Sequence, residues 1–468
     1  MAARRPDRAA RAPAGVRGTH GGGTRHTRWW YAARTPGTAT VRAPAGAVRT
    51  YARAREAYVP GSALTPPPPR DHGPSASPGS VRAMAAQTHR TAAHPARLTV
   101  RELNRATLER QLLLRRSSMS AREAVGHLVG LQAQNTKPPY FQLYARLADF
   151  DPAELSSLME SREVARLVTL RSTLHTHTAD DALTLGPLVR APRDRELASF
   201  RHGLEGVDLD RLAALTQRLV EERPRPLKEL RGELLAHWPA ADPLALTVAA
   251  RCLLPLVQVT PRGLWGRGGQ VALTTVEHWL GRSAGPAPTL DTVVTRYLGA
   301  FGPASVKDFQ SWAGITRTKE VFERLRPRLT TFRDENGAEL FDLPDAPRPD
   351  PDTPAPPRFL PEFDNVLLGH ADRTRVIPAV NKGRNGKGNQ TYGSVLIDGF
   401  LDALWQVRQE QDTAVLTVQP LRKPTRAQTA EITEEAARML AVMSDAPDHD
   451  IRFGTFLDFG DRPQTDLS

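Results

Sequence analysis

Residues 206–286 carry the pattern that most constrains the fold of this chain. Apolar residues recur at helical spacing in three successive stretches, and two short runs rich in valine and threonine follow them. A glycine-rich turn from Gly263 to Gly269 joins the two runs. Three helices followed by such a hairpin predict a winged-helix unit over 206–286. The expected helices are 208–222, 226–236 and 244–255, and the expected strands are 257–260 and 271–274.

Helix-start signals place one further unit before this segment and another after it. Thr99 with Glu102, and Ser120 with Glu123, form capping-box patterns that apolar residues at helical spacing follow. Residues 168–178 alternate like a pair of strands, although no wing is obvious. The expected units are 97–205, a winged helix, and 287–345, a helix-turn-helix with a helix ending at Gly302-Pro303, helices at 304–313 and 316–325, and a turn at Gly314.

The C-terminal part, 346–468, opens with a linker over 346–357 that is rich in proline and aspartate. Beyond it the pattern is mostly that of β-structure, and Asp398-Gly399 between two apolar runs is a hairpin signal. The fold class is therefore predicted as α+β, with tandem winged-helix and helix-turn-helix units and a β-rich C-terminal domain. The expected strands are 375–377, 395–397, 400–405, 414–418 and 453–459, and the expected helix is 426–443.

Residues 1–96 have no helical or strand period and are rich in arginine, proline and alanine. They hold 15 arginines, no lysine and three acids, so 48 basic and 48 acidic residues remain in the rest of the chain. A segment of this composition cannot bury enough apolar surface to fold, and we expect a disordered extension, with Met84 as an alternative start. The functional alternative is a basic arm that attracts phosphates.

This charge distribution means that any nucleic-acid binding by residues 97–468 must rest on local basic loops. The chain has one cysteine, Cys252, in an apolar run, which predicts a buried thiol and a reducing, cytoplasmic setting. No apolar stretch reaches the length of a membrane span, and no signal peptide opens the chain.

The sequence Gln132-Ala133-Gln134 lies where a helix pattern runs towards Pro138-Pro139. Residues two apart point to nearly opposite sides of a helix, but they share a face on an extended chain. Because residues before proline avoid the helical region, we expect the chain to leave the helix near Leu131 and to present both amides together. The alternative is a helix C-terminus with two exposed glutamines.

Three other stretches accompany this pair, at 170–175, 302–309 and 363–373. In this order and spacing the four motifs resemble the winged-helix DNA glycosylases of the AlkZ kind, over roughly 98–460. The resemblance implies a C-shaped monomer that excises N7-alkylated purines from double-stranded DNA and unhooks interstrand crosslinks. It implies roles in DNA repair or self-resistance, a nucleoid-associated bacterial protein, and no cofactor.

The resemblance also implies that Gln132 and Gln134 carry the chemistry. Amides are neither acids nor bases near neutral pH, but alkylation at N7 already makes the purine a good leaving group. Positioning a water and the sugar then suffices, and cleavage should vary little with pH near neutrality. A sister branch of the family, which also excises monoadducts, has aspartate at the position of Gln134, so this chain resembles the crosslink-resistance branch. The substrate-facing candidates are Asn104, His175 and Asp364.

DNA contacts are expected from Lys137 and from a glycine-rich loop, 381–390, that carries Lys382, Arg384 and Lys387. Strand signals flank this loop, so it is predicted to be a hairpin tip that reaches phosphates, with a flexible solvated loop as the alternative. Lys137 as an amine nucleophile would make the enzyme a lyase, and a phosphate contact is the interpretation we prefer.

His175 and His177 alternate on an expected strand and would form half of a zinc site. No further histidine or cysteine cluster lies nearby in the sequence, so we expect no metal. For Asp364 and Asp372 the structural alternatives are a turn bond and an ion pair with a neighbouring arginine.

Two other classes of function stay open at this point. A winged-helix transcription regulator without catalysis would read a spaced palindrome as a dimer. A DNA-coating or toxin-sequestering protein would bind without depending on a particular DNA sequence or on a lesion. Dependence on a lesion rather than on a sequence separates a glycosylase from both.

Overall fold

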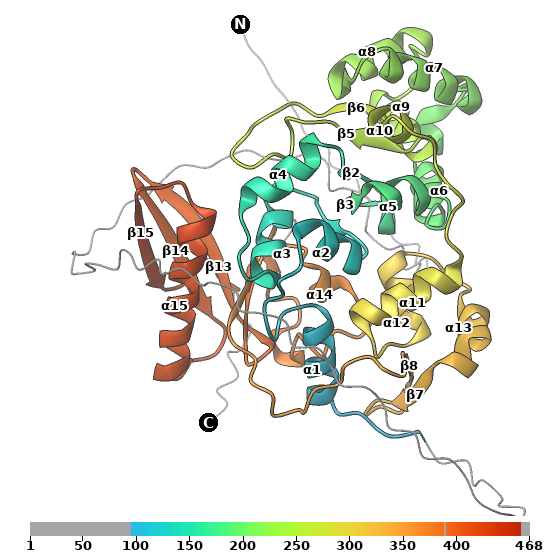
Figure 1. The fold of residues 1–468 in the computed structure, drawn as a ribbon. Helices are drawn as coiled ribbons and strands as arrows, with labels where there is room; N and C mark the ends of the chain where they lie inside the picture. The colour runs from blue at the N-terminus through green and yellow to red at the C-terminus, as the bar shows by residue number, and fades with distance from the viewer. Residues whose placement is uncertain (1–94, 388–389, 460–468) are drawn as a thin grey trace, which may run out of the picture. The chain divides into compact units, whose positions relative to one another are not determined.

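The computed structural model describes residues 95–387 and 390–459 of the 468-residue chain (Figure 1). Residues 1–94 of the expected extension, and 388–389 at the tip of the basic loop, lie outside these residues. In the described part, helices and four β-sheets are mixed along the chain, which confirms the α+β class. No helix in this part is both long and apolar enough to cross a membrane.

The first helices begin at the capping boxes that the sequence predicts. Thr99 and Glu102 cap one helix reciprocally, and Ser120 and Glu123 cap the next. Each box satisfies backbone N–H groups that a helix start leaves without partners. The helices are α1 (Val100–Arg110), α2 (Ala121–His127), α3 (Pro138–Arg146) and α4 (Pro152–Glu160).

A six-stranded antiparallel sheet joins residues that the sequence divides between two units. Its order is β1-β3-β2-β5-β6-β4, and Leu167 of β2 pairs with Val257 of β5. The first two predicted units therefore share one sheet. The strands are β1 (Leu131–Gln132), β2 (Val164–Val168), β3 (Leu174–Thr178), β4 (Arg225–Pro226), β5 (Leu256–Gln258) and β6 (Ala272–Thr275).

The helices around this sheet agree with the predicted pattern of three helices and a hairpin. Each of the three expected helices in 206–286 lies within two residues of its predicted bounds, and β5 pairs with β6 as expected. These helices gather together at one side of the sheet (Figure 1). The helices are α5 (Ala179–Thr184), α6 (Ala191–Ser199), α7 (Leu209–Glu222), α8 (Leu227–His237), α9 (Pro243–Leu253) and α10 (Val276–Leu280).

The next unit has the expected helices and also a hairpin that the sequence did not predict. Gly314 is left-handed, with a φ of 77°, and ends one helix as expected. Buried aromatic rings of Tyr297, Phe309 and Trp312 form its core. The elements are α11 (Leu290–Phe301), α12 (Val306–Ala313), α13 (Lys319–Leu325), and the paired strands β7 (Thr330–Arg333) and β8 (Glu339–Asp342).

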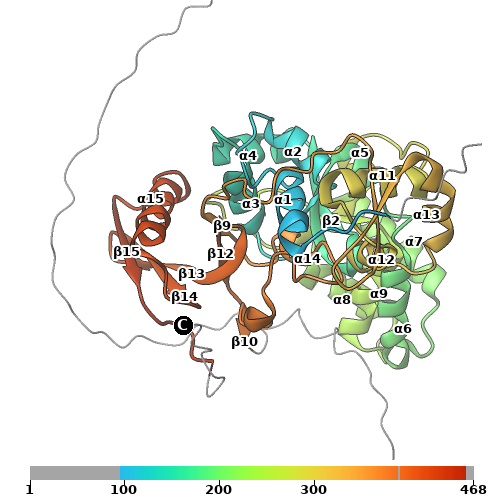
Figure 2. The ribbon, with the colours of Figure 1, turned by 90° about the horizontal axis from the view of Figure 1, so that it is seen from below.

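A five-stranded sheet of order β15-β14-β13-β12-β9 forms the C-terminal part, and α15 packs on one face (Figures 1 and 2). The Asp398-Gly399 turn has φ angles of 50° and 83°, as the hairpin signal requires. The apolar core of α15 continues into α3 through Tyr140 and Trp405. The elements are β9 (Arg358–Leu360), α14 (Asn365–Leu368), β10 (Gly386–Lys387), β11 (Gln390–Thr391), β12 (Gly393–Ile397), β13 (Phe400–Glu410), β14 (Thr413–Pro420), α15 (Arg426–Met443) and β15 (Asp448–Phe453).

Two expected strands are wrong. At 375–377 the backbone N–H groups of Val376 and Ile377 both donate to the carbonyl of Arg373, which makes a turn. The expected strand at 453–459 lies earlier, as β15, and ends at Phe453. Beyond it the side chain of Gln419 accepts the backbone N–H groups that a further ladder would use.

Buried ion pairs connect α1 to later parts of the chain. Arg110 in α1 makes two hydrogen bonds to Asp342 in β8, at 2.5 and 2.9 Å, and both side chains are almost fully buried. Removing one partner of such a pair leaves a buried charge uncompensated, at a cost of about 3–5 kcal/mol. This pair therefore fixes α1 against the β7–β8 hairpin.

We predict that Asp342→Asn lowers the free energy of unfolding by about 3 kcal/mol, because Arg110 loses its buried counter-charge. Urea unfolding followed by tryptophan fluorescence measures the change. Asp291→Asn is the matched control, because its pair with Arg324 is exposed and should shift the midpoint little. Equal effects of the two substitutions would contradict the assignment.

Candidate active site

The chain is extended at Leu131–Gln132, as the sequence predicts, and it bends from Gln134 onwards. Helix α2 ends at His127, earlier than expected, and Val129 and Gly130 turn the chain with φ angles of 56° and 95°. Gln132 then pairs with His175 of β3. A Cβ on Gly130 would lie 2.4 Å from the His177 ring, so this turn needs glycine.

The carbonyl ends of both glutamine side chains are held by donors. Gln132 Oε1 accepts from Arg171 Nη2 at 2.6 Å, and Gln134 Oε1 accepts from the backbone N–H of Leu174 at 3.3 Å. Because both partners can only donate, the orientation of each amide is fixed. In the described residues neither Nε2 group has a hydrogen-bond partner, and Gln132 is 4% exposed whereas Gln134 is half-buried.

Arg171 is a site residue to which the sequence analysis gave no role of its own, although it noted the stretch 170–175. It lies in a short 3-10 helix, Leu170–Ser172, with a left-handed φ of 55°, and its guanidinium also donates to Trp312 O. Burial, with a smaller effect from Arg373, lowers the pKa of Arg171 to about 10, so it stays charged at neutral pH. Only its place in the 170–175 motif signals its role.

His175 and His177 are buried next to this arginine with their rings stacked, at a centroid distance of 5.6 Å. Burial and the charge of Arg171 lower the pKa of His175 well below its ordinary value, and burial lowers that of His177 to about 4. Both rings are therefore neutral near pH 7. Across the described ranges, no three histidine, cysteine, aspartate or glutamate side chains group as metal ligands would.

Asp364, a candidate substrate-facing residue in the sequence, is fully buried. Its two oxygens accept from Arg146 at 2.7 and 2.8 Å, and one also accepts the backbone N–H of Val366, which is the expected turn bond. Its neighbour Asn365, which the sequence did not single out, donates to Gly130 O at 2.7 Å. Asn365 Oδ1 lies 3.4 Å from the backbone nitrogen of Gln132.

Two other candidate residues, Asn104 and Asp372, bind backbone groups of the protein itself. Asn104 in α1 is fully buried, and its amide donates to the carbonyls of Arg375 and Gly399. Asp372 accepts the backbone N–H of Thr374 at 3.0 Å, and no ion pair to a neighbouring arginine is found in the described part of the chain.

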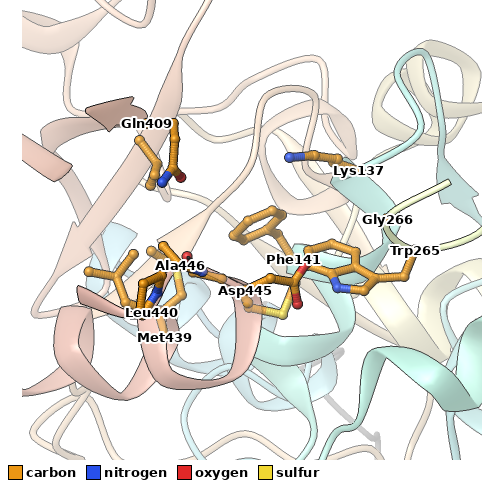
Figure 3. Close-up of a pocket in the computed structure, with 13 residues that line it drawn as sticks. Lys137, Phe141, Trp265, Gly266, Gln409, Met439, Leu440, Asp445 and Ala446 are labelled. Atoms are coloured by element: carbon orange, nitrogen blue, oxygen red, sulfur yellow. Dashed lines mark hydrogen bonds between the residues drawn. The ribbon is translucent and has the colours of Figure 1, made fainter. Parts of the chain in front are cut away.

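Lys137 is exposed beside a cleft of about 460 Å³ (Figure 3). Its Nζ atom lies 5.9 Å from the centre of the Trp265 ring, which comes from the loop between β5 and β6. Phe141 and Met439 line the floor of the cleft, and Asp445 lies on its other side. Residues of α3, of the loop between β5 and β6, and of α15 thus line the cleft together.

The basic loop is a hairpin, as predicted, because β10 pairs with β11. Lys382 is exposed before it, and Lys387 lies in β10. Arg384 is only 7% exposed, and its guanidinium lies 5.8 Å from the centre of the Phe459 ring. Arg384 thus packs inside the protein in this structure.

Four of the nine non-glycine residues with left-handed backbone in the described part of the chain lie around the glutamine pair. Val129, Arg171, Ser172 and Phe363 have φ angles between 55° and 62°. All four lie in or beside the motifs at 130–139, 170–175 and 363–373. Such conformations cost free energy, and proteins concentrate them at functional sites. This strain supports the assignment of the site to the glutamine pair.

Comparisons with known proteins find a matching family model, a similar curated protein and a similar solved structure. A family model described as DNA glycosylase AlkZ-like matches residues 125–442. The chain is similar to the Interstrand DNA cross-link repair glycosylase of Streptomyces sahachiroi, with 24% identity over 363 residues, covering 71% of this chain and 93% of the relative. The solved structure of Streptomyces sahachiroi DNA glycosylase AlkZ is similar in fold, with a TM-score of 0.63 and 20% identity, covering 76% of this chain and all of the other.

We predict that the chain loses stability as the pH falls from 7.5 to 5. Burial lowers the pKa of His177 in the folded chain to about 4, whereas the same ring in the unfolded chain keeps a pKa near 6.5. Above pH 6.5 the ring is neutral in both states and does not change the free energy of unfolding. Below pH 6.5 only the unfolded chain binds a proton there, so the folded state loses stability. The loss from this ring alone should be about 2 kcal/mol at pH 5. Urea midpoints at several pH values measure it. His177→Gln should flatten the slope, and His202→Gln, at an exposed site, should not.

Proposed function

Because this chain belongs to the AlkZ-like DNA glycosylase family, we propose that it hydrolyses the N-glycosidic bond of N7-alkylated purines in double-stranded DNA. The observation that carries this proposal is the fixed orientation of Gln132 and Gln134, whose carbonyls are engaged and whose Nε2 groups are available. Membership of an enzyme family does not favour the regulator interpretation.

We further propose that the substrates include interstrand crosslinks. The Streptomyces relative is named as an interstrand cross-link repair glycosylase. Gln134 also stands where the branch of the family that acts on monoadducts has aspartate. A crosslinked base cannot flip freely into a closed pocket, so the substrate needs a site that is open to the duplex.

The charge of the substrate explains why amides can serve. A purine alkylated at N7 is cationic, and it leaves with the electron pair of the C1′–N9 bond without prior protonation. The sugar develops positive charge as that bond breaks. The Nε2 groups of the pair hold the oxygen of the attacking water or of the sugar in place, which converts a random encounter into an oriented one.

The DNA would lie across helix-and-hairpin units. We interpret α7–α9 with β5–β6, and α11–α13 with β7–β8, as winged-helix units, because each has three helices followed by a hairpin. Lys382 and Lys387 at the β10–β11 hairpin would contact phosphates, as would Lys137 beside the cleft. We propose a monomer, because neither the pair nor the hairpin needs a second copy.

We predict that Gln134→Ala lowers the single-turnover rate of N7-methylguanine excision at least about 10²-fold, because one positioned donor is lost. The assay uses a duplex with one lesion, hot alkali to cleave the abasic product, and a reaction without enzyme to subtract spontaneous depurination. Duplex affinity should change less than about 3-fold by anisotropy. Thr433→Ala, on the exposed surface of α15 and outside the units proposed to contact DNA, is the control. Parallel losses of binding and excision would contradict a catalytic role.

Lys382→Ala should weaken duplex binding at all sequences and reduce the dependence of log Kd on log salt by about one ion, because one phosphate contact is lost. Anisotropy titrations at several salt concentrations measure this slope. Lys423→Ala removes the same charge from another exposed loop and should leave the slope unchanged. An unchanged slope for Lys382→Ala would place the hairpin off the DNA.

A further inference from the structure

The glutamine pair leaves one part of the reaction without a protein group. When water attacks C1′, its oxygen must lose a proton, and an amide cannot take that proton near neutral pH. The pair also presents N–H donors, which bind the water oxygen but do not accept its hydrogen. A residue near the pair that accepts this proton as the bond forms would make the step faster than loss of the proton to solvent.

Glu362 is held beside the pair by a hydrogen bond. Its Oε1 atom accepts from Asn135 Nδ2 at 2.9 Å, and Asn135 directly follows Gln134. Three residues after Glu362, Asn365 contacts Gly130 O and the backbone nitrogen of Gln132. Contacts on both sides of the glutamine pair thus fix the segment that carries Glu362.

The backbone around Glu362 supports a functional position. It follows β9, and the next residue, Phe363, is left-handed with a φ of 62°. A non-glycine residue holds this conformation only where surrounding contacts impose it. The residue that follows Phe363 in the chain is the buried Asp364, which Arg146 holds in place.

Glu362 lacks the arginine that the fully buried carboxylates have. Asp342, Asp364 and Glu435 each pair with arginine, whereas no ion pair to Glu362 is found among the described residues. Burial raises the pKa of the half-buried Glu362 carboxyl, opposed only by hydrogen bonds from Asn135 and from its own backbone. An unpaired carboxylate in such a place costs stability, which is typical of a functional group.

The charged groups on the neighbouring elements are engaged elsewhere. Arg146 of α3 binds Asp364, and Arg171 binds Gln132 and Trp312 O. Lys137, two residues after Asn135, lies over Trp265. None of these cations contributes to the shift of the Glu362 pKa. In the described part of the chain the carboxylate is therefore bound by an amide and not by a cation.

We propose that Glu362 is the general base of the excision that the proposed function assigns to this site. Its carboxylate takes one proton from the water that Gln132 and Gln134 hold. The water oxygen bonds to C1′, the C1′–N9 bond breaks, and its electron pair leaves with the purine. That pair neutralises the cationic ring, so the products are an abasic sugar, a neutral alkylpurine and a protonated Glu362.

A base of this kind gives the reaction a defined pH dependence. Only the carboxylate form is active, so the rate falls as the pH drops through the raised pKa of Glu362. Above that limb the rate should be flat, because His175 and His177 are already neutral. The result is a single acid limb rather than a bell.

Glu362→Gln tests the proposal, because it keeps the shape and an oxygen that can accept from Asn135 but removes the basicity. The single-turnover rate on the N7-methylguanine duplex should fall about 10²-fold, and the acid limb should disappear. Duplex affinity should stay within about 3-fold. The melting temperature should not fall, because the substitution removes an unpaired half-buried charge. Formate should partly restore the rate of Glu362→Ala.

Asn135→Ala provides a second readout. The hydrogen bond from Asn135 lowers the Glu362 pKa, so its loss should move the acid limb to higher pH. Glu277→Gln is the matched control, because that carboxylate also accepts one hydrogen bond from a neutral nitrogen, and it should leave the profile unchanged.

The outcomes separate the two proposals. If wild type excises nothing, the proposed function fails and Glu362 has no reaction to serve. If excision depends on Gln134 but Glu362→Gln keeps the full rate and the acid limb, the general base is overturned and the glycosylase stands. If Glu362→Gln instead loses stability and DNA binding together, Glu362 is a packing residue and the proposal is also overturned.

Discussion

The buried ion pair between Arg146 and Asp364 is the interaction on which the geometry of the site depends. Both side chains are completely buried, and two hydrogen bonds of 2.7 and 2.8 Å join them. Arg146 ends α3, whose Gln142 side chain donates to the carbonyl of Gln132. Asp364 begins α14, whose Asn365 contacts the other side of the same strand. The pair therefore clamps the glutamine strand between segments more than 200 residues apart.

Desolvating both partners of such a pair is costly, and an apolar pair of similar volume is often as stable. What the ion pair provides here is geometry. A guanidinium and a carboxylate with two parallel hydrogen bonds tolerate little rotation or sliding, unlike apolar side chains. Guanidinium groups also bind the motif itself, because Arg171 donates to the side-chain oxygen of Gln132 and Arg166 to Ala133 O at 2.5 Å. Charged donors thus immobilise a motif whose own groups are neutral.

The sequence predicted correctly the elements that depend on neighbouring residues. It misplaced elements that depend on partners far along the chain. The capping boxes at Thr99 and Ser120 and the Asp398-Gly399 turn act through neighbouring residues, so their patterns suffice. In the expected strand at 375–377 the apolar residues Val376 and Ile377 are buried, yet the segment makes a turn. Strand β15 pairs in parallel with β14 only after the long helix α15 intervenes, which displaced the expected strand.

The same distinction applies to the candidate site. The extended chain at Gln132 was predicted, but for the wrong reason, because Lys137 before Pro138 is helical, the two prolines open α3, and Val129 and Gly130 end the preceding helix. Arg171, Asn365 and Glu362 were not singled out, because each gains its role from a partner far along the chain or in an unusual backbone conformation. Asn104 and Asp364 look like substrate groups in the sequence, but their contacts are internal.

The placement of charge around the pair fits a reaction with a cationic leaving group. Such a substrate needs no acid, and an acid held near the purine would add nothing to a bond that is already weakened. It does need ordered water and a place for one proton. Arg171 binds the side-chain oxygen of Gln132, and Arg146 binds both oxygens of Asp364. These groups are therefore not available to accept a proton from water. Glu362, bound by an amide and not by a cation, keeps its basicity for that step.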